Sequence, residues 1–125
     1  MEKPPLSALQ RDQGREGDAD NDAKVNYENG VHAQTSGNAQ NECATRPSIQ
    51  GILDQCIEQN MYLDEKPCYE RYQNNDPKAC YSFKSGPGCE CQYGHYENMT
   101  GTYNSLACGI YVTPEGEFKA VMNFY

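Results

Sequence analysis

Residues 106–125 read LACGIYVTPEGEFKAVMNFY, and this stretch decides the class of fold. Two runs within it, Leu106–Val112 and Phe118–Tyr125, are rich in residues that favour β-strands, and every other side chain from Phe118 to Phe124 is apolar. Between the two runs, Thr113–Gly116 reads TPEG, which places Pro at the second and Gly at the fourth position of a type I turn. The sequence therefore predicts a terminal β-hairpin.

The clearest helical pattern lies upstream, from Ser48 to Lys66. Its apolar side chains recur with helical spacing on one stripe, which comprises Ile49, Ile52, Leu53, Cys56 and Ile57. Ser48 is a candidate N-cap and Pro67 a candidate stop signal. We expect one amphipathic helix that packs this stripe against the sheet.

The composition indicates one small, cross-linked domain. The chain has 125 residues and no internal repeat, and its Leu, Ile, Val and Phe residues are too few to build a large core. Ten Tyr and seven Cys compensate, because tyrosines bury large surfaces and disulfides lower the entropy of the unfolded chain. This cysteine density favours an oxidising, extracellular compartment.

The spacing of the cysteines limits their pairing. Cys89 and Cys91 are too close in sequence to bond comfortably to each other, so each is expected to reach a distant partner. Residues 68–92 hold four Cys without a clean period, and they are predicted to form a loop held by disulfides. Because seven is odd, at least one thiol is free, intermolecular or without its usual partner.

The first 30 residues differ from the rest. Residues 1–30 are polar and acidic, with a weak helical pattern that Gly30 is expected to end, and they are predicted to be partly mobile. Residues 31–125 are predicted to form the core. The net charge of −8, without any Lys/Arg cluster, argues against a nucleic-acid partner. No stretch is apolar and long enough to span a membrane, and a secretory signal would lie outside these residues.

Three motifs in the last third of the chain resemble a known family. Gly94–Met99 reads GHYENM, Ala107–Ile110 reads ACGI and Val121–Phe124 reads VMNF, with Tyr103 between the first two. This order resembles the signature of the CAP superfamily, which contains cysteine-rich secretory proteins, venom antigens and plant pathogenesis-related proteins. The resemblance implies an α/β fold of the CAP type, an α-β-α sandwich with a small, mainly antiparallel sheet. The first helix of the family would precede Pro4-Pro5-Leu6 and is not found in this chain.

The resemblance also implies a site. In CAP domains two His and two Glu line a central cleft, and here the matching residues are His32, Glu42, Glu65 and His95. Glu42 comes from Gln40-Asn41-Glu42, which resembles the G-E-N element in altered order, and Glu65 closes a segment similar to W-x-x-E. Two imidazoles and two carboxylates suit zinc or another divalent cation, whose binding should weaken in acid. The alternative is that the four side chains only hydrogen-bond to one another.

The cysteine density and the site that the resemblance implies together predict a secreted binding module with a divalent cation in the cleft. The family further implies a sterol or other lipid in an apolar groove, or an extracellular protein or polysaccharide as partner. The candidate walls of the cleft are Tyr62, Tyr93, Tyr96 and Tyr103, although tyrosines packed in a thin core are equally ordinary.

Two other functions remain open at this point. One is a zinc-dependent hydrolase with Glu42 or Glu65 as the base, although no HExxH motif occurs. The other is a disulfide-rich inhibitor or toxin with an inert cleft. The physiological ligand and the oligomeric state do not follow from the sequence.

Overall fold

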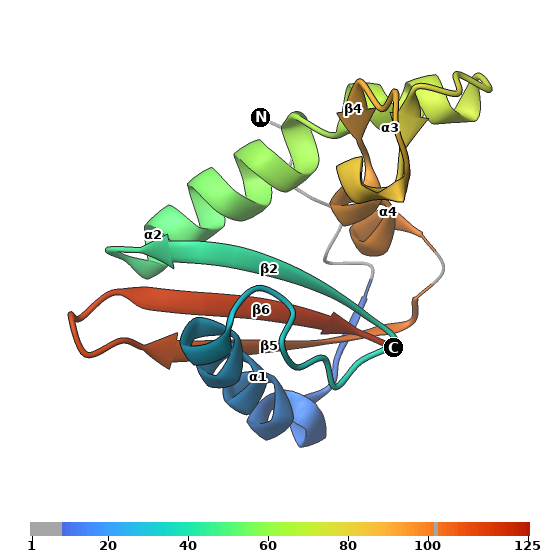
Figure 1. The fold of residues 1–125 in the computed structure, drawn as a ribbon. Helices are drawn as coiled ribbons and strands as arrows, with labels where there is room; N and C mark the ends of the chain where they lie inside the picture. The colour runs from blue at the N-terminus through green and yellow to red at the C-terminus, as the bar shows by residue number, and fades with distance from the viewer. Residues whose placement is uncertain (1–8, 102) are drawn as a thin grey trace.

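A four-stranded mixed sheet forms the centre of the molecule in the computed structural model, which describes residues 9–101 and 103–125. The strand order is β1-β5-β6-β2, with β1 at Gln10–Arg11, β2 at Ala39–Arg46, β5 at Ser105–Val112 and β6 at Phe118–Phe124. β1 runs parallel to β5, and the other neighbours are antiparallel (Figure 1). Pro4-Pro5-Leu6 lies outside the described residues.

The predicted hairpin is confirmed as β5 and β6. Its register pairs Leu106 with Phe124 and Val112 with Phe118. In the turn, the Gly116 amide donates to the Thr113 carbonyl at 2.9 Å, and Gly116 has a φ of 83°, which a side chain would make unfavourable. The turn motif in the sequence therefore joins the strands as expected.

Helix α1 (Glu16–Asn29), preceded by the single turn η2 (Gln13–Arg15), covers one face of the sheet. Ala19 and Ala23 are fully buried in a small cluster against β5 and β6, and a Cβ atom at Gly109 would lie 2.0 Å from the Ala19 backbone. The helix ends at Gly30, as predicted. The described part of the acidic N-terminal segment thus packs against the sheet through α1 (Figure 1).

The other face is covered by the helix that begins at α2 (Ile49–Gly51) and continues as the π-helix η3 (Ile52–Leu63). Ser48 caps it as predicted, since its Oγ accepts a hydrogen bond from the Gly51 amide at 3.0 Å. Pro67 does not stop this helix. The helix ends at Leu63, and Pro67 lies in the first turn of α3 (Lys66–Gln73). Backbone N–H groups in the first turn have no acceptor within the helix, so the lack of an N–H in proline costs no hydrogen bond there.

The main core lies beneath η3. The Cys43–Cys56 disulfide joins β2 to this helix. The buried members of the core are Cys43, Ile52, Cys56, Ile57, Met61, Tyr62, Met99, Ala120, Met122 and Phe124. Two of the predicted stripe residues, Ile49 and Leu53, are exposed instead. Ile49 is the first residue of the helix, before the π turns begin, and the wider π turns shift the buried stripe away from Leu53.

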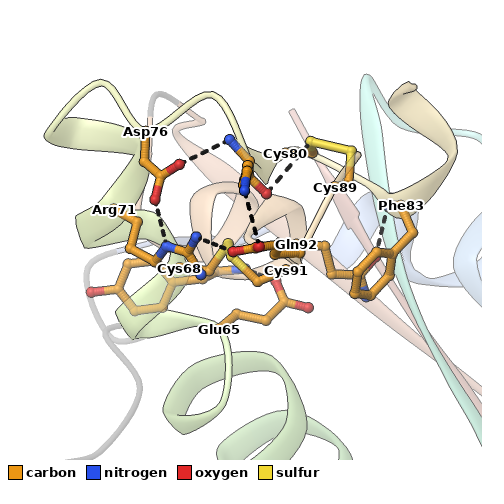
Figure 2. Close-up of a disulfide and its surroundings, with 12 residues drawn as sticks. Glu65, Cys68, Arg71, Asp76, Cys80, Phe83, Cys89, Cys91 and Gln92 are labelled. Carbon is orange, nitrogen blue, oxygen red and sulfur yellow. Dashed lines mark hydrogen bonds and ion pairs between the residues drawn. A yellow bond between two sulfur atoms is a disulfide. The ribbon is translucent and has the colours of Figure 1, made fainter. Parts of the chain in front are cut away.

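Residues 68–92 are held by two disulfides, as predicted, but they are not one loop, because residues 68–73 belong to α3. The segment after α3 contains β3 (Ala79–Cys80), η4 (Phe83–Ser85), β4 (Cys91–Gln92) and α4 (Gly94–Thr100). Cys68 bonds to Cys91 and Cys80 bonds to Cys89, so each cysteine of the CxC pair reaches a distant partner (Figure 2). Cys108 on β5 is the free thiol. Within residues 9–101 and 103–125, no helix has the length and apolar character needed to cross a membrane.

Candidate functional site

A polar pocket of about 200 Å³ lies beside β2, the edge strand of the sheet. The loop after α1, the start of α4 and the disulfide-held segment meet β2 at this place. We call it the two-histidine pocket, and it is lined by His32, Gln40, Tyr81, Ser82, Gln92, Gly94, His95 and Asn98. The structure thus brings both predicted histidines, His32 and His95, to one pocket.

His32 makes two hydrogen bonds to side chains of β2. Its amide donates to Glu42 Oε1 at 2.8 Å, and its ring Nδ1 lies 2.8 Å from Gln40 Oε1. Because Gln40 Nε2 donates to Asn123 Oδ1 at 2.9 Å, Gln40 Oε1 is the acceptor toward His32. Nδ1 of His32 therefore carries a proton, and in the neutral ring Nε2 holds the free lone pair.

The backbone of His32 is also unusual. Its φ of 55° lies in the left-handed region, which disfavours residues with a side chain by roughly 1–2 kcal/mol. Histidine is among the residues that adopt this conformation more often than most. The strained position places the ring next to Gln40 at the pocket.

His95 is oriented in the same manner from the opposite side. Its ring Nδ1 lies 2.5 Å from Glu65 Oε2, while Glu65 Oε1 accepts the amides of His95 at 2.9 Å and Tyr96 at 3.2 Å. A carboxylate can only accept, so Nδ1 of His95 donates and Nε2 remains the free ring nitrogen. Glu65 itself is 7% exposed and positions the imidazole from behind.

Glu42 does not line the two-histidine pocket. Its Oε2 pairs with Lys119 Nζ at 2.5 Å, and its Oε1 accepts from Asn26 Nδ2 at 2.9 Å as well as from the His32 amide. The Nδ1 atom of His32 is 3.7 Å from Glu42, farther than from Gln40. Gln40, two residues earlier on the same face of β2, occupies the place beside the imidazole. Gln40-Asn41 also resembles the E-N of the G-E-N element, with Gln in place of Glu. This second alignment of the motif would have predicted Gln40 as the site residue.

The four predicted ligands do not converge on one point. Nowhere in the described ranges do three or more His, Cys, Asp or Glu side chains form a group placed to hold a metal ion. Two imidazoles share the pocket, whereas Glu42 and Glu65 act through hydrogen bonds behind them.

Buried polar groups between α1 and the sheet support the loop that carries His32. Asp22 is fully buried and accepts hydrogen bonds from Gln34 Nε2, from both the amide and hydroxyl of Ser36, and from Asn123 Nδ2, each at 2.8 Å. Burial alone would raise the pKa of Asp22, but these hydrogen bonds outweigh it and hold the pKa below 3.8. No motif in the sequence predicted this set of buried polar side chains.

The predicted cleft tyrosines lie elsewhere. Tyr62 is buried in the main core and packs on Tyr96 with ring centroids 5.2 Å apart. Tyr93 stacks on Tyr72 at 4.4 Å, and burial together with the nearby Glu97 charge raises the pKa of Tyr93 to about 12. Tyr103 lines a different pocket. None of the four lines the two-histidine pocket.

A more apolar groove of about 470 Å³ lies on the part of the sheet near β1 and β5 that η3 leaves open. Its lining residues are Leu9, Arg11, Glu16, Asp20, Leu106, Cys108 and Ile110. Cys108 is exposed at this groove, but partial removal of its thiol from water and the nearby Glu16 charge raise the pKa of the thiol, which lowers its reactivity at neutral pH. This groove is the place where the predicted lipid or sterol binding is to be tested.

The fold and the pocket define a disulfide-stapled, mixed α/β protein with two oriented histidines at a sheet edge. No family model matches the chain, and neither a curated protein nor a solved structure matches it. The likeness to the CAP superfamily therefore stands on the sequence motifs alone.

Proposed function

We propose that this protein is a secreted binding module of the CAP type, and that its two-histidine pocket binds a divalent cation such as zinc. The observation that carries the proposal is the shared orientation of the two imidazoles. In both rings Nδ1 is engaged by an acceptor of the protein, and both rings line one pocket.

Hydrogen bonds at Nδ1 are typical of histidines that bind metal through Nε2. A carboxylate or carbonyl acceptor fixes the tautomer and the ring orientation, and it increases the basicity of the free nitrogen. Glu65 plays this part for His95, and Gln40 plays it for His32. The net charge of −8 favours the approach of cations.

The carboxylates favour binding over hydrolysis. A metal-dependent hydrolase needs a base within reach of the bound water. Both oxygens of Glu42 and both oxygens of Glu65 already accept hydrogen bonds or ion pairs, and both side chains are less than one tenth exposed. Neither is available to take a proton from a ligand in the pocket.

The three disulfides support an extracellular location. Cysteines in reducing compartments stay as thiols, whereas six of the seven cysteines here are paired. Two of these disulfides lie in the segment that supplies Tyr81, Ser82 and Gln92 to the pocket wall. The proposed secretion would therefore place the chain where the disulfides that hold the pocket wall can form.

Calorimetric titration with zinc at neutral pH tests the proposal. We expect a dissociation constant in the micromolar range, since two imidazoles supply fewer protein ligands than a structural zinc site. Variant His32→Ala/His95→Ala should lose the binding, and Glu65→Gln should weaken it by roughly tenfold or more because the acceptor loses its charge. Binding should also weaken as the pH is lowered, since protons compete for the imidazoles.

The matched control is Glu28→Gln, an exposed carboxylate on α1 that should leave the affinity unchanged. Circular dichroism of each variant shows whether it remains folded. Absence of zinc binding by the unmodified protein, or unchanged binding by the double variant, would overturn the proposal and leave a disulfide-rich interaction protein with an inert cleft as the better reading.

A further inference from the structure

A second pocket, of about 340 Å³, lies next to the two-histidine pocket and is lined mainly by tyrosine. Its lining residues are Tyr69, Tyr81, Glu97, Asn98, Gly101 and Tyr103. The two pockets share Tyr81 and Asn98, and the Tyr81 hydroxyl donates to Asn98 Oδ1 at 2.8 Å. This hydrogen bond forms part of the wall between them. We call the second hollow the tyrosine pocket.

The three tyrosines of this pocket come from separate parts of the chain. Tyr69 lies on α3, Tyr81 follows β3 and Tyr103 precedes β5. Each ring rests on an aromatic ring that is not part of the lining: Tyr69 on Tyr96 at 5.2 Å, Tyr81 on Tyr93 at 6.1 Å and Tyr103 on Phe124 at 5.9 Å. Contacts with these outer rings therefore hold the three tyrosines of the pocket in place in the absence of a ligand.

The three rings leave space between them. In the part of the chain that the structure describes, no ring contact joins Tyr69, Tyr81 and Tyr103 to one another. Their hydroxyls and rings therefore border a hollow instead of filling it. A pocket of this size is at the lower end for small-molecule sites, so it suits a compact group and not a long acyl chain.

Within the described part of the lining, Glu97 supplies the only charged side chain. It is half-buried, and its carboxylate makes no hydrogen bond or ion pair with any other described residue. Burial raises the pKa of Glu97, as expected for a carboxyl group removed from water without a cationic partner. A positive charge placed in the pocket would relieve this cost.

We propose that the tyrosine pocket binds a compact organic ammonium cation, such as a choline group. Three aromatic rings and one carboxylate without a counter-charge are the features that recognise quaternary ammonium ions, because the faces of the rings attract cations and the methyl groups pack on them. Among the residues that the structure describes, no Lys or Arg lines the pocket to occupy this place. The proposal does not depend on a metal in the neighbouring pocket.

The first experiment compares choline chloride with 3,3-dimethylbutan-1-ol, which has nearly the same shape and no charge. Binding is followed by the NMR signals of the tyrosine rings. Choline should bind in the millimolar range or tighter and the neutral alcohol about tenfold more weakly. Equal affinity for the two, or binding of methyl β-glucoside in preference to choline, would overturn the proposal and indicate an apolar or sugar pocket.

Variants of the lining test the residues themselves. Glu97→Gln keeps the shape and should weaken choline binding about fivefold or more, and Tyr103→Leu should weaken it further. The matched controls are Glu28→Gln and Tyr111→Leu, which lie outside the pocket and should leave the affinity unchanged. Unchanged affinity in Glu97→Gln would contradict the assignment even if Tyr103→Leu does not fold.

Two further arms separate this proposal from others. His32→Ala/His95→Ala should retain choline binding, so failure of the zinc proposal and failure of this one are distinguishable. Phosphatidylcholine vesicles replace free choline in a sedimentation assay. Binding of free choline alone supports a soluble cation as the ligand, and additional binding of the vesicles supports a lipid headgroup with the same ammonium group.

Discussion

Replacement of Asp22 by Ala is expected to lower the free energy of unfolding by about 2–4 kcal/mol. Four donors from Gln34, Ser36 and Asn123 converge on the buried carboxylate. The fully buried Asn123 amide would be left without this acceptor, and the more exposed Gln34 and Ser36 would lose the contacts that hold their loop on α1. An unsatisfied buried donor costs about 1–3 kcal/mol, although the costs do not add fully. Urea unfolding of the variant and of the unmodified protein measures the difference.

The difference in the free energy of unfolding between the unmodified protein and Asp22→Ala should decrease at acid pH. The pKa of Asp22 is lower in the folded protein than the ordinary value of 3.8, so its contribution to stability is complete above that value. It is lost as the pH falls below 3.8 through the folded pKa. We expect the gap between the two proteins to narrow in acid. Asp18→Asn, an exposed carboxylate on the same helix, should change stability by less than about 0.5 kcal/mol. A gap that is small at pH 7, or constant down to acid pH, would contradict this account.

Replacement of Lys119 by Met is expected to destabilise the protein by about 3–5 kcal/mol. The Lys119 and Glu42 side chains are 7% and 4% exposed, and their charged atoms lie 2.5 Å apart. Removal of the ammonium group leaves the Glu42 carboxylate buried, with Asn26 Nδ2 and the His32 amide as its neutral donors among the described residues. Because Glu42 also accepts the His32 amide, the same change should loosen the two-histidine pocket and weaken zinc binding.

Two comparisons separate the loss of charge pairing from a general effect of the substitution. Lys24→Met on the exposed side of α1 should alter stability by less than about 0.5 kcal/mol. Lys119→Met/Glu42→Gln should recover part of the loss, since the remaining side chain is then neutral. Chemical unfolding gives each value. If the free energy of unfolding of Lys119→Met is within about 1 kcal/mol of that of the unmodified protein, the Lys119–Glu42 ion pair does not stabilise the fold as proposed.

The hairpin and the disulfide-held segment were predictable because their signals are local. The TPEG turn and the alternation from Phe118 to Phe124 mark two strands, and Cys89 and Cys91, one residue apart, exclude each other as partners. The start of the long helix at Ser48 followed from its capping hydroxyl. Its end was predicted wrongly, because Pro67 fits equally well in the first turn of a new helix.

The site was predicted only in part. His32 and His95 were found through family motifs, and they do line one pocket. Gln40 and Glu42 are two residues apart and face the same side of β2, so only the loop that carries His32 decides which of them meets the imidazole. The Asp22 layer could not be inferred, since its partner Asn123 is 101 residues away in sequence. A polar residue on a weak helix gives no local sign that it is buried.

The most direct test of the two-histidine pocket is long-range ¹H–¹⁵N NMR of the imidazole rings, which is unambiguous because the chain contains only two histidines. At a pH where both rings are neutral, each is predicted to carry its proton on Nδ1, and added zinc should shift both Nε2 resonances together. A proton on Nε2 of either ring, or a zinc response confined to one histidine, would contradict the account.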